Sequence, residues 1–351
     1  VMEHLVRPGD SPAGVLRRGG GEIEEEPRDD GEAEQHRERG VPADDAVDRP
    51  GVSHARDILT QEARLLLPRC LEAFWLKPFD AVWDAAVAVV LRRLRWDEPS
   101  LDLGCGDGLF MLLAAGGRLR LEADRYTPPS RQDGRLISAE APPRRCTVGL
   151  DYQARGLASA RQTGVYRGLG CGDGQALPFP DRTFSTVFSN ALYWLPDWAT
   201  GLREMRRVVR DGGQVVLVVP HERIAGFLRS SRRTLATRVV AWVDRGRFAR
   251  LTRLTGDRDT WRRRLADAGL NLTASIPVLD GTTIARWDCS TRPLLPLLLG
   301  VNRLLQRLRL KVFLKRPIVS LLSGVMRPWL RRSLTVSEDS CAMWVLVASP
   351  V

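Results

Sequence analysis

Three glycines at alternate positions, Gly104, Gly106 and Gly108, constrain the fold of this chain more than any other feature. They follow a short stretch at 100–103, which we interpret as a buried strand, and they precede an apolar run at 109–115 that predicts the start of a helix. Glycine accepts positive φ and has no Cβ, so the backbone can turn sharply between them and approach a ligand closely. The N–H groups of the helix start then point at whatever lies above the strand end. The pattern predicts a nucleotide-type cofactor site at the carboxyl edge of a parallel sheet.

The spacing of these glycines identifies the kind of site. A dinucleotide fingerprint is G-x-G-x-x-G, whereas here an acidic residue precedes G-x-G-x-G. The sequence Leu-Asp-Leu-Gly-Cys-Gly-Asp-Gly resembles the first motif of the class I S-adenosylmethionine (SAM)-dependent methyltransferases, of the small-molecule, type 11-like family. The resemblance implies an α/β fold: a Rossmann-like, seven-stranded, mostly parallel sheet with helices on both faces and a C-terminal antiparallel hairpin strand. It also implies a SAM site that includes Asp102, Gly104, Cys105, Gly106 and Gly108.

Two acidic residues are candidates for binding the ribose of the cofactor. In such folds the acidic residue that binds the ribose hydroxyls lies about 20 residues after the glycine loop. Glu122 stands at the usual distance but runs into a Pro- and Arg-rich stretch. Asp151 ends a strand-like run, 146–151, and a helix follows it, as a right-handed crossover requires. We therefore assign the ribose to Asp151, with Tyr152 beside it, and keep Glu122 as the alternative. Residues 117–145 then form an insert.

A second glycine-rich segment, 170–179, repeats the letters Gly-Cys-Gly-Asp-Gly. Pro178 and Pro180 forbid the helix that a second nucleotide loop would need. The segment instead resembles the family element G-D-A-x-x-L-P-F, whose acid meets the adenine amine. That resemblance implies adenine contacts from Asp173 and its neighbour Gly174.

The next strand, 184–189, ends at Asn190, and the resemblance places Asn190 and Tyr193 beside the transferred methyl. An aromatic face also attracts a sulfonium cation. The two prolines that follow Asn in enzymes methylating nucleic-acid bases are missing, so nucleic acid is disfavoured as a substrate. His221 follows the fifth strand and, with Tyr193, is a candidate catalytic residue. Proximity alone can also carry methyl transfer, without a base.

The net charge of +11 divides unevenly and marks the domain boundaries. Residues 1–50 hold seven arginines and 14 acidic residues and little apolar surface, which predicts a disordered tail over 1–52. Residues 53–97 form N-terminal helices that cap the core or cover the cleft, with an aromatic stripe at helical spacing. The methyltransferase domain occupies 98–351, with inserts at about 117–145, 221–256 and 285–335. Within it we expect a helix at 198–210 closed by the glycines at 212 and 213, then strands at 214–219, 272–279 and 342–348.

Residues 293–334 are rich in leucine and in basic side chains. Helical spacing puts one set of apolar residues on one face, opposite three basic ones: Val301, Leu304, Leu305, Leu308 and Val312 against Arg303, Arg307 and Lys311. Three interpretations stay open. The apolar face packs on the sheet or on a partner, it lies on an anionic membrane as a peripheral contact, or it covers a lipid-like substrate.

The predicted function is SAM-dependent methyl transfer to an O, N or C nucleophile of a small, apolar or amphiphilic molecule, natural-product or lipid-linked. The alternatives are an NAD(P)-dependent oxidoreductase, disfavoured by the glycine spacing, and a membrane-surface scaffold with a relict SAM pocket. The six cysteines have no metal-site or disulfide spacing, and the first residues lack a signal-type apolar core. We therefore expect a cytoplasmic protein, with or without peripheral membrane contact, and no metal.

Overall fold

A computed structural model describes residues 50–126, 138–139, 141–228, 247–289 and 294–351. The chain separates into two compact units, 1–55 and 56–351, and the second contains the sheet and every residue of the candidate site. The predicted disordered tail lies outside the described residues, apart from its last three positions, which open the first helix, α1 (Pro50–Phe74).

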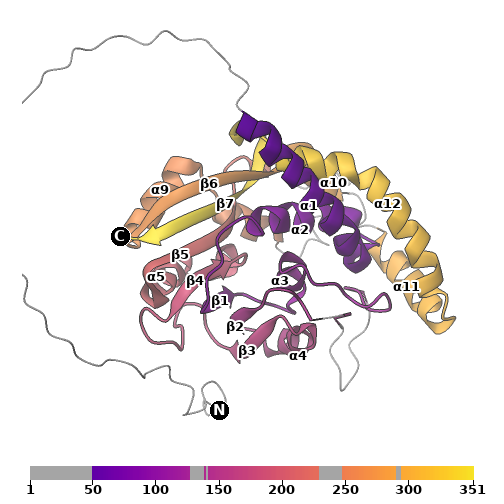
Figure 1. The fold of residues 1–351 in the computed structure, drawn as a ribbon, viewed down its shortest axis with the longest axis horizontal. Coiled ribbons are helices and arrows are strands. Elements are labelled where there is room, and N and C mark those ends of the chain that lie inside the picture. Colours follow the sequence, from indigo (N-terminus) through magenta and orange to yellow (C-terminus); the bar gives the residue numbers. More distant parts are fainter. Residues whose placement is uncertain (1–49, 127–137, 140, 229–246, 290–293) are drawn as a thin grey trace, which may run out of the picture. The chain divides into compact units, whose positions relative to one another are not determined.

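A seven-stranded sheet organises the second unit, in the order β3-β2-β1-β4-β5-β7-β6 (Figure 1). Strands β1 to β5 are parallel, and β7 runs antiparallel to both of its neighbours. This is the predicted class I methyltransferase topology, which is confirmed. The strands are β1 (Ser100–Leu103), β2 (Cys146–Asp151), β3 (Tyr166–Cys171), β4 (Phe184–Ser189), β5 (Val209–Pro220), β6 (Leu270–Asp280) and β7 (Cys341–Pro350).

Helices cover both faces of the sheet. All six residues of β4 are buried, and because successive strand residues point to opposite faces, neither face is open to solvent there. The helices after α1 are α2 (Pro78–Leu91), α3 (Leu109–Ala114), α4 (Ala154–Thr163), α5 (Trp198–Val208), α6 (Ile224–Phe227), α8 (Arg247–Arg253), α9 (Arg258–Asp267), α10 (Gly281–Cys289), α11 (Leu295–Arg307) and α12 (Lys311–Leu334). Short 3-10 turns lie at Leu192–Trp194 and Glu338–Ser340.

The order of the strands creates the crevice in which the site lies. β1 is flanked by β2 on one side and β4 on the other, and the chain reverses its direction of progress across the sheet between them. The loops that leave β1 and β4 therefore diverge, which opens a ligand-binding crevice beyond their carboxyl ends.

One expected helix end, and with it the start of the next strand, is wrong. The helix expected over 198–210 ends at Val208, because Val209 is already extended (φ −78°, ψ 135°) and pairs with Phe184. Gly212 and Gly213 consequently lie inside β5, where the positive φ of Gly212 (+72°) falls within the shift of register between β4 and β5. Backbone pairing with β4 thus outweighs a capping signal that would be valid in isolation.

The aromatic stripe of the N-terminal helices is buried, but it crosses a break between two helices. Phe74 ends α1, and Pro78 starts α2, as proline does at the first position of a helix. Phe74, Trp75, Phe79 and Trp83 are all less than 10% exposed. Two of them, Phe74 and Trp83, also line the pocket described below, so the stripe belongs both to the core and to the cleft.

Candidate active site

The glycine loop is a tight turn that is hydrogen-bonded to the end of β2. The N–H groups of Gly104 and Cys105 both donate to the carbonyl of Leu150, at 2.8 and 3.1 Å. Gly104, Gly106 and Gly108 have φ of +84°, +57° and +76°, a region that disfavours side chains. A Cβ on Gly104 would lie 2.3 Å from the Cβ of Ala191, whereas one on Gly106 would meet nothing within 4 Å. The loop therefore packs tightly against the end of β4 and leaves open space at Gly106.

Asp151 lies where the sequence predicted, as the last residue of β2 and beside the loop. Its Oδ2 accepts from the N–H of Gly106 at 2.9 Å, and its Oδ1 accepts from the N–H of Gln153 at 2.8 Å. The side chain of its neighbour Tyr152 is exposed. Glu122 lies instead in the loop that follows β1 and α3, where its carbonyl accepts from Lys311 Nζ. The choice of 146–151 as the second strand is confirmed, and the ribose contact of Asp151 stays a prediction.

Asp102 supports the loop from inside the protein. Its side chain is buried on β1, and its Oδ2 accepts from the Tyr166 hydroxyl at 2.6 Å. Burial raises the pKa of the Asp102 carboxyl to about 7, while the bond from Tyr166 opposes that shift. Cys105 is buried as well, and burial raises the pKa of its thiol. Neither group is arranged as a surface nucleophile.

Asp173 lies in the turn after β3, on the same edge of the sheet. Its carboxylate is exposed and accepts from the N–H of Gln175 at 2.9 Å. Gly174 is buried, and a Cβ there would come within 3.2 Å of Leu195 and Leu103. The ends of β2 and β3 are tied together, because the N–H of Gly172 donates to the carbonyl of Asp151 at 3.1 Å. The candidate ribose and adenine residues thus share one edge.

A cavity of about 320 Å³ opens in front of the glycine loop. It brings together the loop residues Gly104, Cys105 and Gly106 with Asn190 and Tyr193 from the end of β4, and their contacts with a cofactor stay a prediction. Six aromatic side chains from several elements line it: Phe74, Trp83, Phe110, Tyr193, Trp194 and Trp287. The cavity therefore offers a glycine surface for a cofactor and aromatic walls for an apolar partner.

Carboxylates that the sequence analysis missed also line the cavity. Asp80 and Asp84 reach it from α2, and Asp107 reaches it from the loop, where it forms an ion pair with Arg125. Burial raises the pKa of Asp84 to about 7, and the charge of Asp80 adds to the shift. The available signal was a pair of aspartates four residues apart in an otherwise apolar helix, because even a partly buried charge is costly without a partner or a function.

Asn190 carries an unsatisfied polar atom in this cavity. Its Oδ1 is buried and finds no hydrogen-bond partner within the described part of the chain. A buried acceptor without a partner is uncommon in proteins, and a ligand donor is one way to satisfy it. SAM carries an ammonium group and hydroxyls, so this amide and the open loop at Gly106 both fit such a ligand.

His221 does not join the site. It lies at the end of β5, almost fully buried, and is absent from the described residues that line the cavity. Its Nδ1 accepts from the N–H of Arg223 at 3.1 Å, and its ring lies 5.2 Å from that of Trp344. Burial lowers the pKa of His221. The imidazole therefore stabilises the turn after β5 by accepting this hydrogen bond. Tyr193, the other catalytic candidate, lines the cavity.

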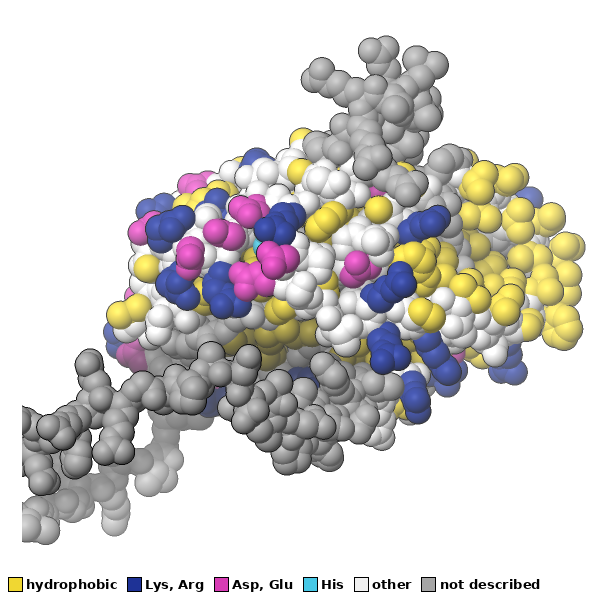
Figure 2. Space-filling view, turned by 90° about the horizontal axis from the view of Figure 1, so that it is seen from above, with side chains coloured by type: hydrophobic (Ala, Val, Ile, Leu, Met, Phe, Trp, Pro, Cys, Tyr) yellow, Lys and Arg dark blue, Asp and Glu magenta, His cyan; other side chains and the backbone are white. Residues whose placement is uncertain are grey.

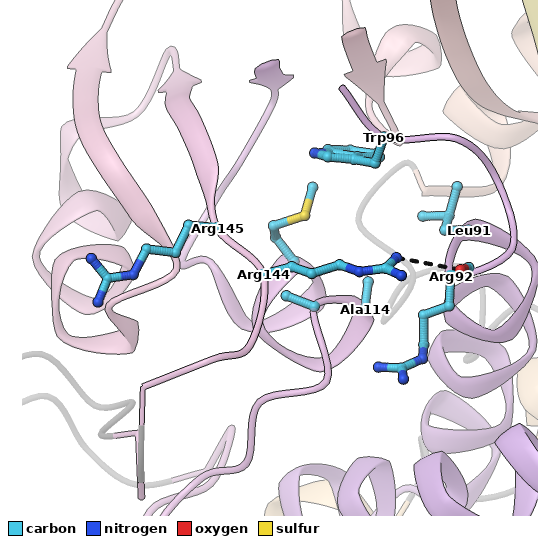
Figure 3. A pocket seen from close by; sticks show the side chains of 8 residues that line it. Leu91, Arg92, Trp96, Ala114, Arg144 and Arg145 are labelled. Atoms are coloured by element: carbon cyan, nitrogen blue, oxygen red, sulfur yellow. Dashed lines mark hydrogen bonds between the residues drawn. The ribbon is translucent and has the colours of Figure 1, made fainter. Parts of the chain in front are cut away.

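A second, smaller cavity lies at the other edge of the sheet, where β2 begins (Figure 3). Arg92, Trp96 and Arg144 line it, and Arg144 Nη1 donates to the carbonyl of Arg92 at 3.3 Å. Its volume of about 20 Å³ holds about one water molecule. It is too small for a nucleotide cofactor.

Comparison with known proteins decides the family. The methyltransferase domain family matches residues 134–217, which run from before β2 into β5. The demethylmenaquinone methyltransferase of Corynebacterium kroppenstedtii is 31% identical over 163 residues, which cover 40% of this chain and 67% of that protein. The chain belongs to the SAM-dependent methyltransferases. SAM is the methyl donor of this family, as the resemblance of the glycine loop predicted.

Other similarities of this methyltransferase are more partial. The malonyl-[acyl-carrier protein] O-methyltransferase of Erwinia pyrifoliae is 29% identical over 182 residues, covering 50% of this chain and 56% of that one. The chain spans only 33% of the length of the corresponding Halorhodospira halophila protein. A Geobacter sulfurreducens SAM-dependent methyltransferase solved with S-adenosylhomocysteine (SAH) is 16% identical, with 77% and 90% of the chains covered and a TM-score of 0.39. The strand order, and not this last similarity, establishes the fold.

Proposed function

We propose that this methyltransferase transfers the methyl group of SAM to a nucleophile of a small, uncharged molecule that is apolar or amphiphilic and carries an aromatic ring. The observation that carries the proposal is the aromatic cavity of about 320 Å³ that opens directly onto the glycine loop. Flat aromatic walls favour a flat ring by stacking and edge contacts. A methyl donor and an apolar acceptor can therefore meet there without intervening water.

The residues that would hold the cofactor follow from their positions. Gly104 and Gly106 provide a surface without side chains, Asp151 and Asp173 carboxylates from neighbouring strand ends, and Asn190 an unsatisfied amide oxygen. SAM supplies an activated methyl group on a sulfonium, so the protein needs mainly to orient the acceptor and exclude water. The aromatic face of Tyr193 is suited to contact a sulfonium cation.

The charges of the cavity argue for an uncharged acceptor. Three aspartates line it, Asp80, Asp84 and Asp107, and its arginine, Arg125, is paired with one of them. A carboxylate acceptor would meet net negative charge at close range, which is unfavourable. Relatives are named for malonyl-[acyl-carrier protein], whose malonyl group carries a carboxylate, and for demethylmenaquinone, an uncharged quinone. The cavity suits the second kind of molecule better.

Asp84 is the group we assign as proton acceptor. A hydroxyl or amine that gains a methyl must lose a proton, and a base works best when its pKa lies near the working pH. The raised pKa of Asp84, about 7, meets this condition, and its carboxylate lies in the cavity wall. The hydroxyl of Tyr193 then helps to position the acceptor.

The test is methyl transfer from labelled SAM to matched acceptors. We expect turnover with a naphthol or reduced naphthoquinone and none with malonyl-coenzyme A. Asp84→Asn should lower kcat about 10²–10⁴-fold and remove the loss of rate below pH 7, while its affinity for SAH stays unchanged. The control Asp211→Asn, at an exposed position, should leave kcat, the pH dependence of the rate and SAH affinity unchanged. Faster methylation of malonyl-coenzyme A would contradict the assignment of the acceptor. Loss of SAH binding in Asp84→Asn would show that the carboxylate holds the cofactor instead.

A further inference from the structure

An apolar stripe runs along the outside of α11. Leu294, Leu297, Val301, Leu304 and Leu308 follow one another at spacings of three and four residues, so they share one face of the helix. All five are exposed, Leu297 to 67%. The sequence alone left open that this face packs on the sheet. The structure exposes three of its five predicted members, Val301, Leu304 and Leu308, whereas Leu305 and Val312 are only partly exposed. A surface helix normally turns such a face inward, so its exposure calls for a partner.

The stripe continues on α12, which follows after a sharp turn at Arg309 (φ +57°). Leu310, Phe313, Leu321 and Val325 are exposed there, and Phe313 is 75% exposed. Figure 2 shows hydrophobic side chains gathered at the end of the molecule where Figure 1 shows α11 and α12. Together, these nine residues of α11, α12 and their capping positions form one surface, which we call the apolar ridge.

Buried ion pairs fix the ridge in its outward orientation. Lys311 and Lys315, on the inner face of α12, lie 3.0 and 3.6 Å from the buried carboxylate of Asp124. Trp75 donates to the same carboxylate at 2.8 Å. The predicted placement of Lys311 on the basic face, opposite the apolar residues, is therefore wrong, because this lysine is buried in an ion pair. Since both lysines must face inward, the opposite side of α12 must face solvent.

Exposed arginines surround the ridge. Seven of them lie on α11, α12 and the turn between: Arg303, Arg307, Arg309, Arg316, Arg327, Arg331 and Arg332. The sequence contains no Asp or Glu from residue 289 to residue 337. None of the seven forms an ion pair with a carboxylate of the described residues. This side of the molecule is thus both apolar and strongly positive.

We propose that the apolar ridge and its arginines bind the surface of an anionic membrane, with α11 and α12 lying in the interface. Helices with an apolar face bordered by arginines insert that face among the acyl chains while the arginines meet the anionic headgroups. None of the described helices is long and apolar enough to cross a membrane. A second copy of the chain fits less well, because two ridges facing each other would bring arginines against arginines.

The ridge also adjoins the proposed acceptor cavity. Lys311 and Lys315 donate to the carbonyls of Glu122 and Leu121, in the same loop as the cavity residue Arg125. α12 packs against α2, which carries Asp84. A membrane-bound protein would therefore hold its cavity beside the lipid. The delivery of an acceptor from the lipid to this cavity rests on the proposed function, whereas the binding of the protein to vesicles does not.

Vesicle cosedimentation of the whole protein tests the proposal. We expect binding to phosphatidylcholine vesicles with 30% phosphatidylglycerol, and at least tenfold weaker binding to phosphatidylcholine alone. Arg303→Gln/Arg307→Gln/Arg316→Gln should weaken binding about 100-fold, at about fivefold per arginine. Its control, Arg161→Gln/Arg203→Gln/Arg210→Gln, removes three exposed arginines elsewhere and should bind normally.

A second pair of variants tests the apolar part. Phe313→Ser should weaken binding at least fivefold, and Leu65→Ser, which removes an exposed leucine of α1, should not. Circular dichroism and SAH binding show whether each variant remains folded. The proposal fails if the wild-type protein ignores anionic vesicles, or if the control variants lose binding equally. It also fails if the ridge variants leave vesicle binding intact and abolish self-association, or abolish binding to an acidic carrier protein.

Discussion

Gly104→Ala tests the packing of the glycine loop most sharply. Gly104 has φ +84°, and a Cβ there would lie 2.3 Å from the Cβ of Ala191. The left-handed conformation costs about 1–2 kcal/mol for alanine, and overpacking of this kind costs about 1–3 kcal/mol. We therefore expect the free energy of unfolding to fall by about 2–5 kcal/mol. Because relief of the clash moves the loop, SAH affinity should fall as well.

Two control variants separate the cost of the left-handed backbone conformation from the cost of the clash with Ala191. All variants are measured by urea unfolding and by calorimetric titration with SAH. Gly212→Ala has φ +72° but no atom within 4 Å of its new Cβ, so it should cost only about 1–2 kcal/mol. Adding Ala191→Gly to Gly104→Ala removes the clash and should recover about 1–3 kcal/mol relative to the sum of the single variants. Equal effects of Gly104→Ala and Gly212→Ala, with no recovery in the double variant, would refute the reasoning.

Further predictions concern the groups buried around the site. Asp124→Asn leaves two buried lysines without their carboxylate and should lower the free energy of unfolding by about 3–5 kcal/mol, measured in urea; a loss below 1 kcal/mol would contradict the buried ion pairs. The raised pKa of Asp102, about 7, means that the folded protein keeps a proton that the unfolded chain releases near pH 4. Its contribution to stability is therefore full below pH 4 and lost as pH rises through 7, and Asp102→Asn should flatten this decline in thermal unfolding. Asp151→Ala should weaken SAH binding by about 1–3 kcal/mol in calorimetry, while Glu122→Ala should not; the reverse result would reassign the ribose.

The sequence predicted the sheet because each strand carries a local signal. β2 and β4 are short segments rich in β-branched and apolar residues that end in a polar residue at the crevice, and β1, which leads into the glycine loop, lies between them. The errors occurred where tertiary contacts overrode local patterns. The end of α5 depends on the pairing of Val209 with β4, which no helix signal reports. The orientation of α12 depends on Asp124, in a loop almost 200 residues away from its lysine partners.

The candidate site was predictable only in part. Strand ends follow the chain in regular order, so Asp151 could be named from its place at the end of a strand, and the family resemblance pointed to Asn190. Asp84 could not be placed in the same way, because α2 reaches the cavity through packing of the N-terminal helices and not through the sheet order. His221 had the right position in the strand pattern, but the turn after β5 binds its Nδ1 away from the cavity.

Calorimetric titration of the wild-type protein with SAH and, separately, with NAD tests the central claim most directly. That claim is that the glycine loop, the ends of β2 and β4 and the aromatic cavity form one site for a SAM-type cofactor. We predict that SAH binds one molecule per chain and that Asp173→Ala weakens this binding, while NAD produces no binding heat. Binding of NAD, or SAH binding that is unaffected by both Gly104→Ala and Asp151→Ala, would contradict the account.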